Sequence, residues 1–153
     1  MLRKIISGGQ TGADQGGLLA GKSLGIETGG TAPPGWVTDM GPQKEYLMSF
    51  GLLEGEPDLK IFVKRTIKNV QDADGTLWMG KENSPGGKLT LGTCRKLEKP
   101  FIINPTSFQL KEWIETNNIQ ILNVAGNRER RNLGICQKTR NLIVSTFCPI
   151  IDF

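Results

Sequence analysis

Short apolar runs alternate along the chain with longer segments in which apolar positions recur at helical spacing. The short runs at residues 2–7, 77–79, 99–104 and 119–124 have strand length and are apolar enough to be buried, and a further short strand is predicted near 26–30. Amphipathic patterns predict helices at 14–24, 59–70, 88–97, 107–116 and 133–147. Strands that alternate with helices favour βαβ units, so we expect an α/β domain with a mostly parallel sheet of about five or more strands.

Two segments depart from this alternation. Residues 31–42 contain Pro33 and Pro34, which exclude a helix interior and a central strand, so we expect a long irregular loop of functional interest. Trp36 in this loop is placed either to stack on a planar ligand or to seal the domain edge, and we favour the second. Residues 46–55 carry a short apolar pattern that predicts a half-covered helix.

Length and composition describe one globular domain. The 153 residues suffice for a single core, without a linker or repeat, so we assign 1–153 to one ligand-binding domain. The net charge of +4 is scattered along the chain. This weak positive charge suits phosphorylated small molecules, and it argues against a nucleic-acid partner.

The chain has no histidine, which excludes Ser-His-Asp and Cys-His catalysis and histidine-ligated zinc. We assign no catalytic residue and no metal-ligand set. Cys94, Cys136 and Cys148 are widely spaced, and we expect buried thiols in a reducing compartment. The sequence shows no signal peptide and no membrane-spanning apolar run, so we expect a cytoplasmic protein without a membrane partner.

The first Gly-rich segment directly follows the strand predicted at 2–7. A strand, a Gly-rich turn and a helix start together aim backbone N–H groups and the positive end of the helix dipole at one point, where a phosphate binds well. The segment lacks the P-loop lysine and the G-x-G-x-x-G spacing. It is therefore either an anion site or a plain β–α turn with Asp14 as helix N-cap. The candidate binding residues here are Gly8, Gly9, Gln10, Thr11, Gly12, Ala13 and Asp14.

Two later segments repeat this arrangement. A turn from Ser84 to Thr90 follows the strand at 77–79, and another follows the strand at 119–124. In a parallel sheet such turns gather at the carboxyl ends of the strands, where ligands bind. Arg128 is either a fork for a phosphate or carboxylate or an ordinary surface arginine. The candidate binding residues here are Pro85, Gly86, Gly87, Lys88, Thr90, Ala125, Gly126, Asn127, Arg128 and Glu129.

Asp72-Ala73-Asp74-Gly75-Thr76 resembles half of a calcium loop, but the bidentate glutamate that such a loop requires is missing. The segment is either a simple turn before a strand or a site for Mg²⁺ or a ribose, with Asp74 and Thr76 as its candidate residues.

Taken in order, these motifs resemble one known group. Gly8–Asp14, Arg65-Thr66 with Asn69-Val70, Asp72–Thr76, Gly86–Thr90 and Asn123–Glu129 are similar to the circularly permuted YpsA branch of the SLOG superfamily. The resemblance implies a Rossmann-like three-layer αβα sandwich, a phosphorylated nucleotide- or pterin-like ligand and a homo-oligomer. Members are called molybdenum carrier proteins, which implies the molybdenum cofactor, a pterin that bears a phosphate and an oxo-metal dithiolene.

A related group, the Lonely Guy type phosphoribohydrolases, carries P-G-G-x-G-T-x-x-E. Leu89 replaces the third glycine here, and Thr93 stands at the position of the catalytic glutamate. Hydrolysis would need a carboxylate from elsewhere, such as Asp74 or Glu129. The sequence thus favours a carrier that binds its ligand without turnover, with a nucleotide hydrolase or nucleotide sensor as the alternative.

Overall fold

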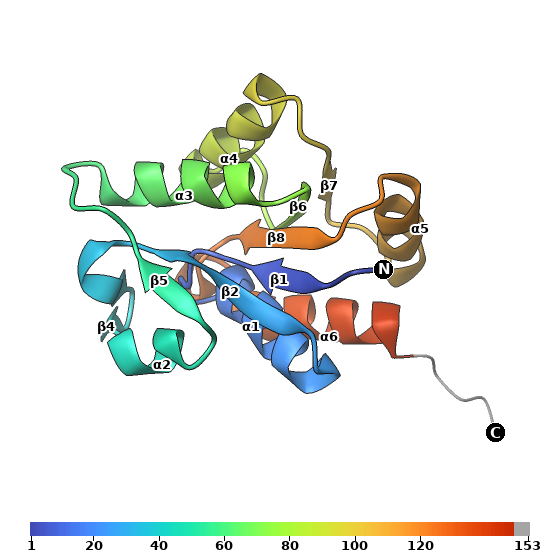
Figure 1. The fold of residues 1–153 in the computed structure, drawn as a ribbon, viewed down its shortest axis with the longest axis horizontal. Coiled ribbons are helices and arrows are strands. Elements are labelled where there is room, and N and C mark those ends of the chain that lie inside the picture. Colours follow the sequence, from blue (N-terminus) through green and yellow to red (C-terminus); the bar gives the residue numbers. More distant parts are fainter. Residues whose placement is uncertain (149–153) are drawn as a thin grey trace.

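The computed structural model describes residues 1–148 and places a parallel sheet at the centre of the molecule (Figure 1). Within these residues, six strands pair in the order β5-β2-β1-β8-β6-β7, and each pair is parallel. The strands are β1 (Lys4–Ile6), β2 (Glu27–Ala32), β5 (Leu52–Glu54), β6 (Gly75–Met79), β7 (Phe101–Ile103) and β8 (Ile121–Gly126).

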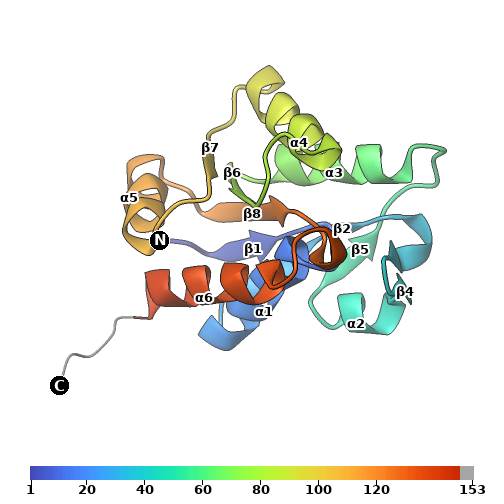
Figure 2. The same ribbon diagram turned by 180° about the vertical axis from the view of Figure 1, so that it is seen from behind.

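Helices cover both faces of the sheet, as the two opposite views show (Figures 1 and 2). On one face α1 (Ala13–Leu24) packs against α6 (Ile135–Phe147), and α5 (Ser107–Thr116) adjoins α6 at the edge. On the other face lie α3 (Ile61–Asp72) and α4 (Pro85–Lys96). The predicted α/β class and the Rossmann-like sandwich of three layers are confirmed.

The main apolar core lies between the sheet and the α1–α6 layer. Alternate residues of a strand point to opposite faces, and Leu77 of β6 and Val124 of β8 join the core on this side. Their neighbours on the opposite face include Thr76 and Asn123, which are buried and hydrogen-bonded to each other. The face beneath α3 and α4 is therefore more polar than the α1 face.

The helix predicted at residues 46–55 is wrong over most of that range. Residues 46–55 form the end of a short helix, α2 (Lys44–Met48), followed by the edge strand β5. Gly51 has a φ of +82°, which ends the helical conformation and turns the chain onto β2. A short apolar run fits either element, and only its pairing with β2 makes this one a strand.

The loop predicted at 31–42 contains more structure than expected. A 3₁₀ turn at Pro34–Trp36 leads into a small antiparallel hairpin of β3 (Val37–Thr38) and β4 (Gly41–Pro42). Trp36 is 7% exposed and belongs to a second apolar cluster with Leu47 and Phe50. The favoured role for Trp36, sealing the edge of the domain, is confirmed.

Helix α4 begins at Pro85, three residues before the predicted start. Ser84 caps the helix by accepting the Gly87 N–H, and Pro85 occupies the first helical turn, where its missing N–H costs nothing. The Gly-Gly pair is thus part of the helix and not of a preceding turn. No helix among the described residues is long and apolar enough to cross a membrane.

Candidate functional site

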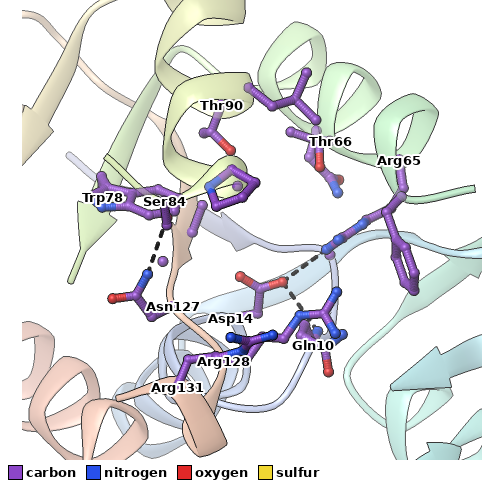
Figure 3. Close-up of a pocket in the computed structure, with 18 of the residues that line it drawn as sticks. Gln10, Asp14, Arg65, Thr66, Trp78, Ser84, Thr90, Asn127, Arg128 and Arg131 are labelled. Carbon is purple, nitrogen blue, oxygen red and sulfur yellow. Dashed lines mark hydrogen bonds and ion pairs between the residues drawn. The ribbon is translucent and has the colours of Figure 1, made fainter. Parts of the chain in front are cut away.

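A cavity of about 860 Å³ opens at the carboxyl edge of the sheet, beneath α3 and α4 (Figure 3). Residues from all three predicted segments line it, because β1, β6 and β8 lie side by side in the sheet and end at the same edge. The predicted residues in the lining are Gly8, Gln10, Asp14, Pro85, Gly86, Thr90, Ala125, Gly126, Asn127 and Arg128.

The other predicted residues stand outside the lining, and several of them hold the turns together. Gly12 has a φ of +89°, and a Cβ atom there would collide with the backbone at Asn127 and Glu129. The adjacent Ala13 N–H donates to the Asn127 carbonyl at 3.2 Å. The turn that follows β1 and the turn that follows β8 therefore contact each other closely through their backbones. The predicted residues outside the lining are Gly9, Thr11, Gly12, Ala13, Asp74, Thr76, Gly87, Lys88 and Glu129.

The two carboxylates considered for hydrolysis both accept hydrogen bonds from backbone N–H groups. Asp74 accepts the N–H groups of Gln120 at 3.0 Å and Ile121 at 2.8 Å, where β8 begins, at the amino edge of the sheet. Glu129 accepts the N–H groups of Gly134 and Cys136 at the start of α6. Asp74 therefore belongs to a turn before a strand, the simpler of its two interpretations, and its carboxylate is not available in the cavity for Mg²⁺ or a ribose.

Asp14 is not the N-cap of α1, because the cap position belongs to Gly12 and the helix begins at Ala13. The Asp14 carboxylate instead accepts the Gln10 N–H at 3.1 Å and pairs with Arg65 at 3.0 Å. The side chains of this ion pair are only 7% and 12% exposed. Burial raises the pKa of the Asp14 carboxyl and lowers that of the Arg65 guanidinium, and each partner's charge offsets part of the other's shift.

Arg128 lies at the rim of the cavity in a network of charges. Its guanidinium pairs with Asp39 at 2.7 Å, and Arg130 approaches the same carboxylate at 3.1 Å. Phe62 stands beside two cations, with Arg65 at 5.7 Å and Arg128 at 5.3 Å from its ring centroid. The rim is thus prearranged by an aromatic ring and by the hairpin that carries Asp39.

The charges in the lining are strongly unequal. Four of the described lining residues are cationic, whereas Asp14 alone carries a carboxylate, and that carboxylate is already paired. A cavity with low-dielectric walls concentrates this positive potential, so it favours an anionic ligand. The cations are Arg65, Lys81, Arg128 and Arg131.

The amino end of α4 contacts the turn that follows β8 at the cavity wall. Asn127 accepts the Lys81 N–H at 2.6 Å, and its amide nitrogen lies 3.4 Å from the Ser84 hydroxyl (Figure 3). This contact fixes the cap of α4 beside the carboxyl end of β8. The positive end of the α4 dipole therefore adds to the charge of the cations.

Several residues of the lining were not predicted from the sequence. Arg65 appeared only inside a family motif, since no local signal separates it from the exposed Lys64 and Lys68 of the same helix. Trp78 and Asn123 lie within strands, where the pattern indicates burial but not the face. The lining residues that were not predicted are Phe62, Val63, Arg65, Thr66, Asn69, Trp78, Lys81, Asn83, Ser84, Leu89, Asn123 and Arg131.

A parallel sheet between helical layers, with a cationic cavity at its carboxyl edge, defines a protein of the Rossmann-like class with a candidate ligand site. A sequence model of the circularly permutated YpsA SLOG family matches residues 5–147, and the chain belongs to this family. The chain is 33% identical to a solved protein from Syntrophus aciditrophicus named "putative molybdenum carrier protein", with a TM-score of 0.83 over 95% of each chain. The comparison with curated proteins gives no significant match.

Proposed function

We propose that this protein binds a phosphorylated, planar, nucleotide- or pterin-like molecule in the cavity and acts as its carrier, without turnover. One observation carries the proposal: four cations surround a cavity that contains a single, already paired carboxylate. Apolar and aromatic side chains, among them Phe62 and Leu89, supply surface for a planar ring. We further propose the molybdenum cofactor as the cargo, which the name of the Syntrophus aciditrophicus protein suggests.

The lining fits the organic part of this cofactor. The cavity of about 860 Å³ lies within the range of roughly 300–1,000 Å³ typical of small-molecule sites. Arg65 and Arg128 suit its phosphate, and the wall between α3 and α4 suits its ring. Among the described residues, no group of histidine, cysteine or acidic side chains could hold a metal ion. The protein would therefore hold the cargo by its phosphate and ring.

A hydrolase acting on nucleotides is the second candidate, and one observation favours it. Asp14 is a buried carboxylate in the wall of the cavity, where it could stabilise a developing positive charge on a sugar. The close pairing of Asp14 with Arg65 reduces this capacity, so we place the carrier first. Release of free base or phosphate from a nucleotide, lost in Asp14→Asn, would reverse that order.

The decisive experiment combines native mass spectrometry of the purified protein with thermal shift against AMP, ADP-ribose, inorganic phosphate, molybdate and molybdenum cofactor, with adenosine as the control without phosphate. A bound pterin mass, or stabilisation by the cofactor alone, supports the carrier. Stabilisation by nucleotides but not by the cofactor would leave the cavity a nucleotide site and remove the molybdenum assignment. Indifference to every phosphorylated compound would contradict the proposal as a whole.

We also propose a homo-oligomer, following the family resemblance. The same native mass spectra measure it, because a monomer has a mass of 16.8 kDa and any assembly a multiple of that value. A monomer at every concentration tested would contradict this proposal. The cytoplasmic location stays a prediction.

A further inference from the structure

Asn123 lies in the middle of β8, among the lining residues of the cavity, and is 3% exposed. A buried amide in a strand needs partners for both of its polar atoms. The Asn123 amide nitrogen donates to the Thr76 hydroxyl on the neighbouring strand β6, at 3.2 Å. No described residue donates a hydrogen bond to the side-chain oxygen of Asn123, Oδ1.

In the structure the side-chain amide nitrogen of Asn123 is turned to Thr76, which leaves the oxygen end of the amide towards the cavity. A hydroxyl has one proton and two lone pairs, so Thr76 can accept from Asn123 and still donate. Its neighbour on α4 is the Cys94 sulfur: burial raises the pKa of that thiol, and a hydrogen bond with Thr76 lowers it in part. With the nitrogen held by Thr76, the carbonyl oxygen is the end left for another partner.

The other buried asparagines of the lining differ in this respect. Asn69 accepts the Thr31 N–H at 2.9 Å and donates to the Thr31 carbonyl at 3.0 Å, so both ends of its amide are satisfied. Asn127 likewise uses both ends, with Lys81 and Ser84 among its partners. Asn123 alone of these three has a side-chain acceptor that no described residue satisfies.

Asn123 is also more deeply buried than the two arginines at the rim of the cavity, Arg128 and Arg131. Asn123 and Thr90 are 3% and 4% exposed, whereas the Arg128 side chain is 35% exposed and Arg131 is open to solvent. A ligand whose phosphate meets the arginines at the rim would carry its ring inward, towards the buried floor. The floor then presents a hydrogen-bond acceptor to the edge of that ring.

We propose that Asn123 selects ligands whose ring carries an amino group, by accepting an N–H from that group, and that Thr76 is the positioning residue that orients it. This deepens the proposed function and rests on it, since the ring must enter the same cavity. The chemical class is a phosphorylated amino-heterocycle, either an aminopurine nucleotide or an aminopterin. Ligands that present a carbonyl or a C–H at that position would leave the Asn123 oxygen unpaired.

The first test needs only the unaltered protein and measures affinity by titration calorimetry for matched pairs. The pairs are AMP with purine riboside 5′-monophosphate, GMP with IMP, and a phosphorylated pterin with its lumazine counterpart. For a parent that binds, we expect its partner without the amino group to bind about tenfold more weakly. Equal affinities, or preference for the partner, would contradict the inference while leaving the proposed function intact. If no parent binds, the proposed function fails, and the inference fails with it.

The second test assigns the discrimination to residues. Asn123→Ala should bring the affinity ratio of the pair close to one. Thr76→Val keeps the shape but removes the hydroxyl, so it should also lower the ratio, whereas Thr76→Ser keeps the hydroxyl and should preserve it. The affinity for ribose 5-phosphate, which has no ring amino group, should stay within about twofold in all three variants. A purely structural role would weaken every ligand alike and leave the ratio unchanged.

Discussion

Arg128 is the residue at which the charge of the cavity rim meets the rest of the molecule. Asp39 and Phe62 hold its guanidinium in place, so the side chain is ordered before any ligand arrives. We predict that Arg128→Ala weakens binding of a phosphorylated ligand by more than tenfold, or about 1.4 kcal/mol, measured by calorimetry. The expectation is based on the loss of a charge-assisted hydrogen bond to the phosphate.

Arg130 provides the matched control for Arg128. It approaches the same Asp39 carboxylate, but its side chain is 65% exposed and it does not line the cavity. Arg130→Ala removes the same formal charge and should change affinity less than threefold. Equal losses in both variants would mean that general electrostatic attraction, and not contact with Arg128, binds the phosphate.

The buried pair of Asp14 and Arg65 predicts an unusual pH dependence of stability. Burial raises the pKa of the Asp14 carboxyl in the folded protein, despite the opposing effect of Arg65. Between its unfolded and folded pKa values, the folded state holds a proton that the unfolded state has released. Stability therefore falls as pH rises through this window. Asp14→Asn has no such proton.

We therefore predict that the free energy of unfolding of the native sequence, relative to that of Asp14→Asn, decreases as pH rises from about 4 towards neutrality. Urea unfolding at a series of pH values measures this difference, in which the titrations shared by both proteins cancel. A difference that grew with pH would show that the attraction of Arg65 outweighs burial and that the pKa is depressed.

At the scale of the element, the cap of α4 connects helix stability to the cavity. Ser84 accepts the Gly87 N–H at 3.1 Å and also lies 3.4 Å from the Asn127 amide in the cavity wall. Thr106 caps α5 in the same way, through the Gln109 N–H at 3.2 Å, away from the cavity. The two helices thus offer one cap inside the candidate site and one outside it.

We predict that Ser84→Ala and Thr106→Ala each lower the free energy of unfolding by about 1 kcal/mol, because each removes a helix cap. Only Ser84→Ala should also weaken binding of the phosphorylated ligand, since it loosens the wall that Asn127 completes. Chemical unfolding and calorimetry on both variants measure the two quantities separately. A loss of affinity in Thr106→Ala of the same size would show that stability alone accounts for the effect.

Elements with a long periodic pattern were predicted well, and so were most of the short strands. Helix α5 has the predicted bounds, and α1 begins one residue before its prediction. The exception is β5, a strand of three residues that was predicted as part of a helix. Three residues carry too little periodicity to separate the two elements, so pairing with β2 decides.

At the scale of the whole molecule, strand order assembles the cavity. β1 and β6 are far apart in sequence, and β8 lies between them in the sheet. This arrangement places the three turns that follow these strands at one edge, with α3 and α4 above them (Figure 1). A ligand held there would contact segments from both halves of the chain.

The sequence by itself determined the α/β class, most helices and the three segments that meet at the cavity, because hydrophobic periodicity and turn chemistry are local properties. Only the tertiary structure decided which side chains face the cavity. Asp14 pairs with Arg65 from 51 positions away, and Glu129 turns to cap α6. The roles of Thr76 and Asn123 likewise depend on a contact between β6 and β8. Such partners are brought together by strand order, which no local pattern encodes.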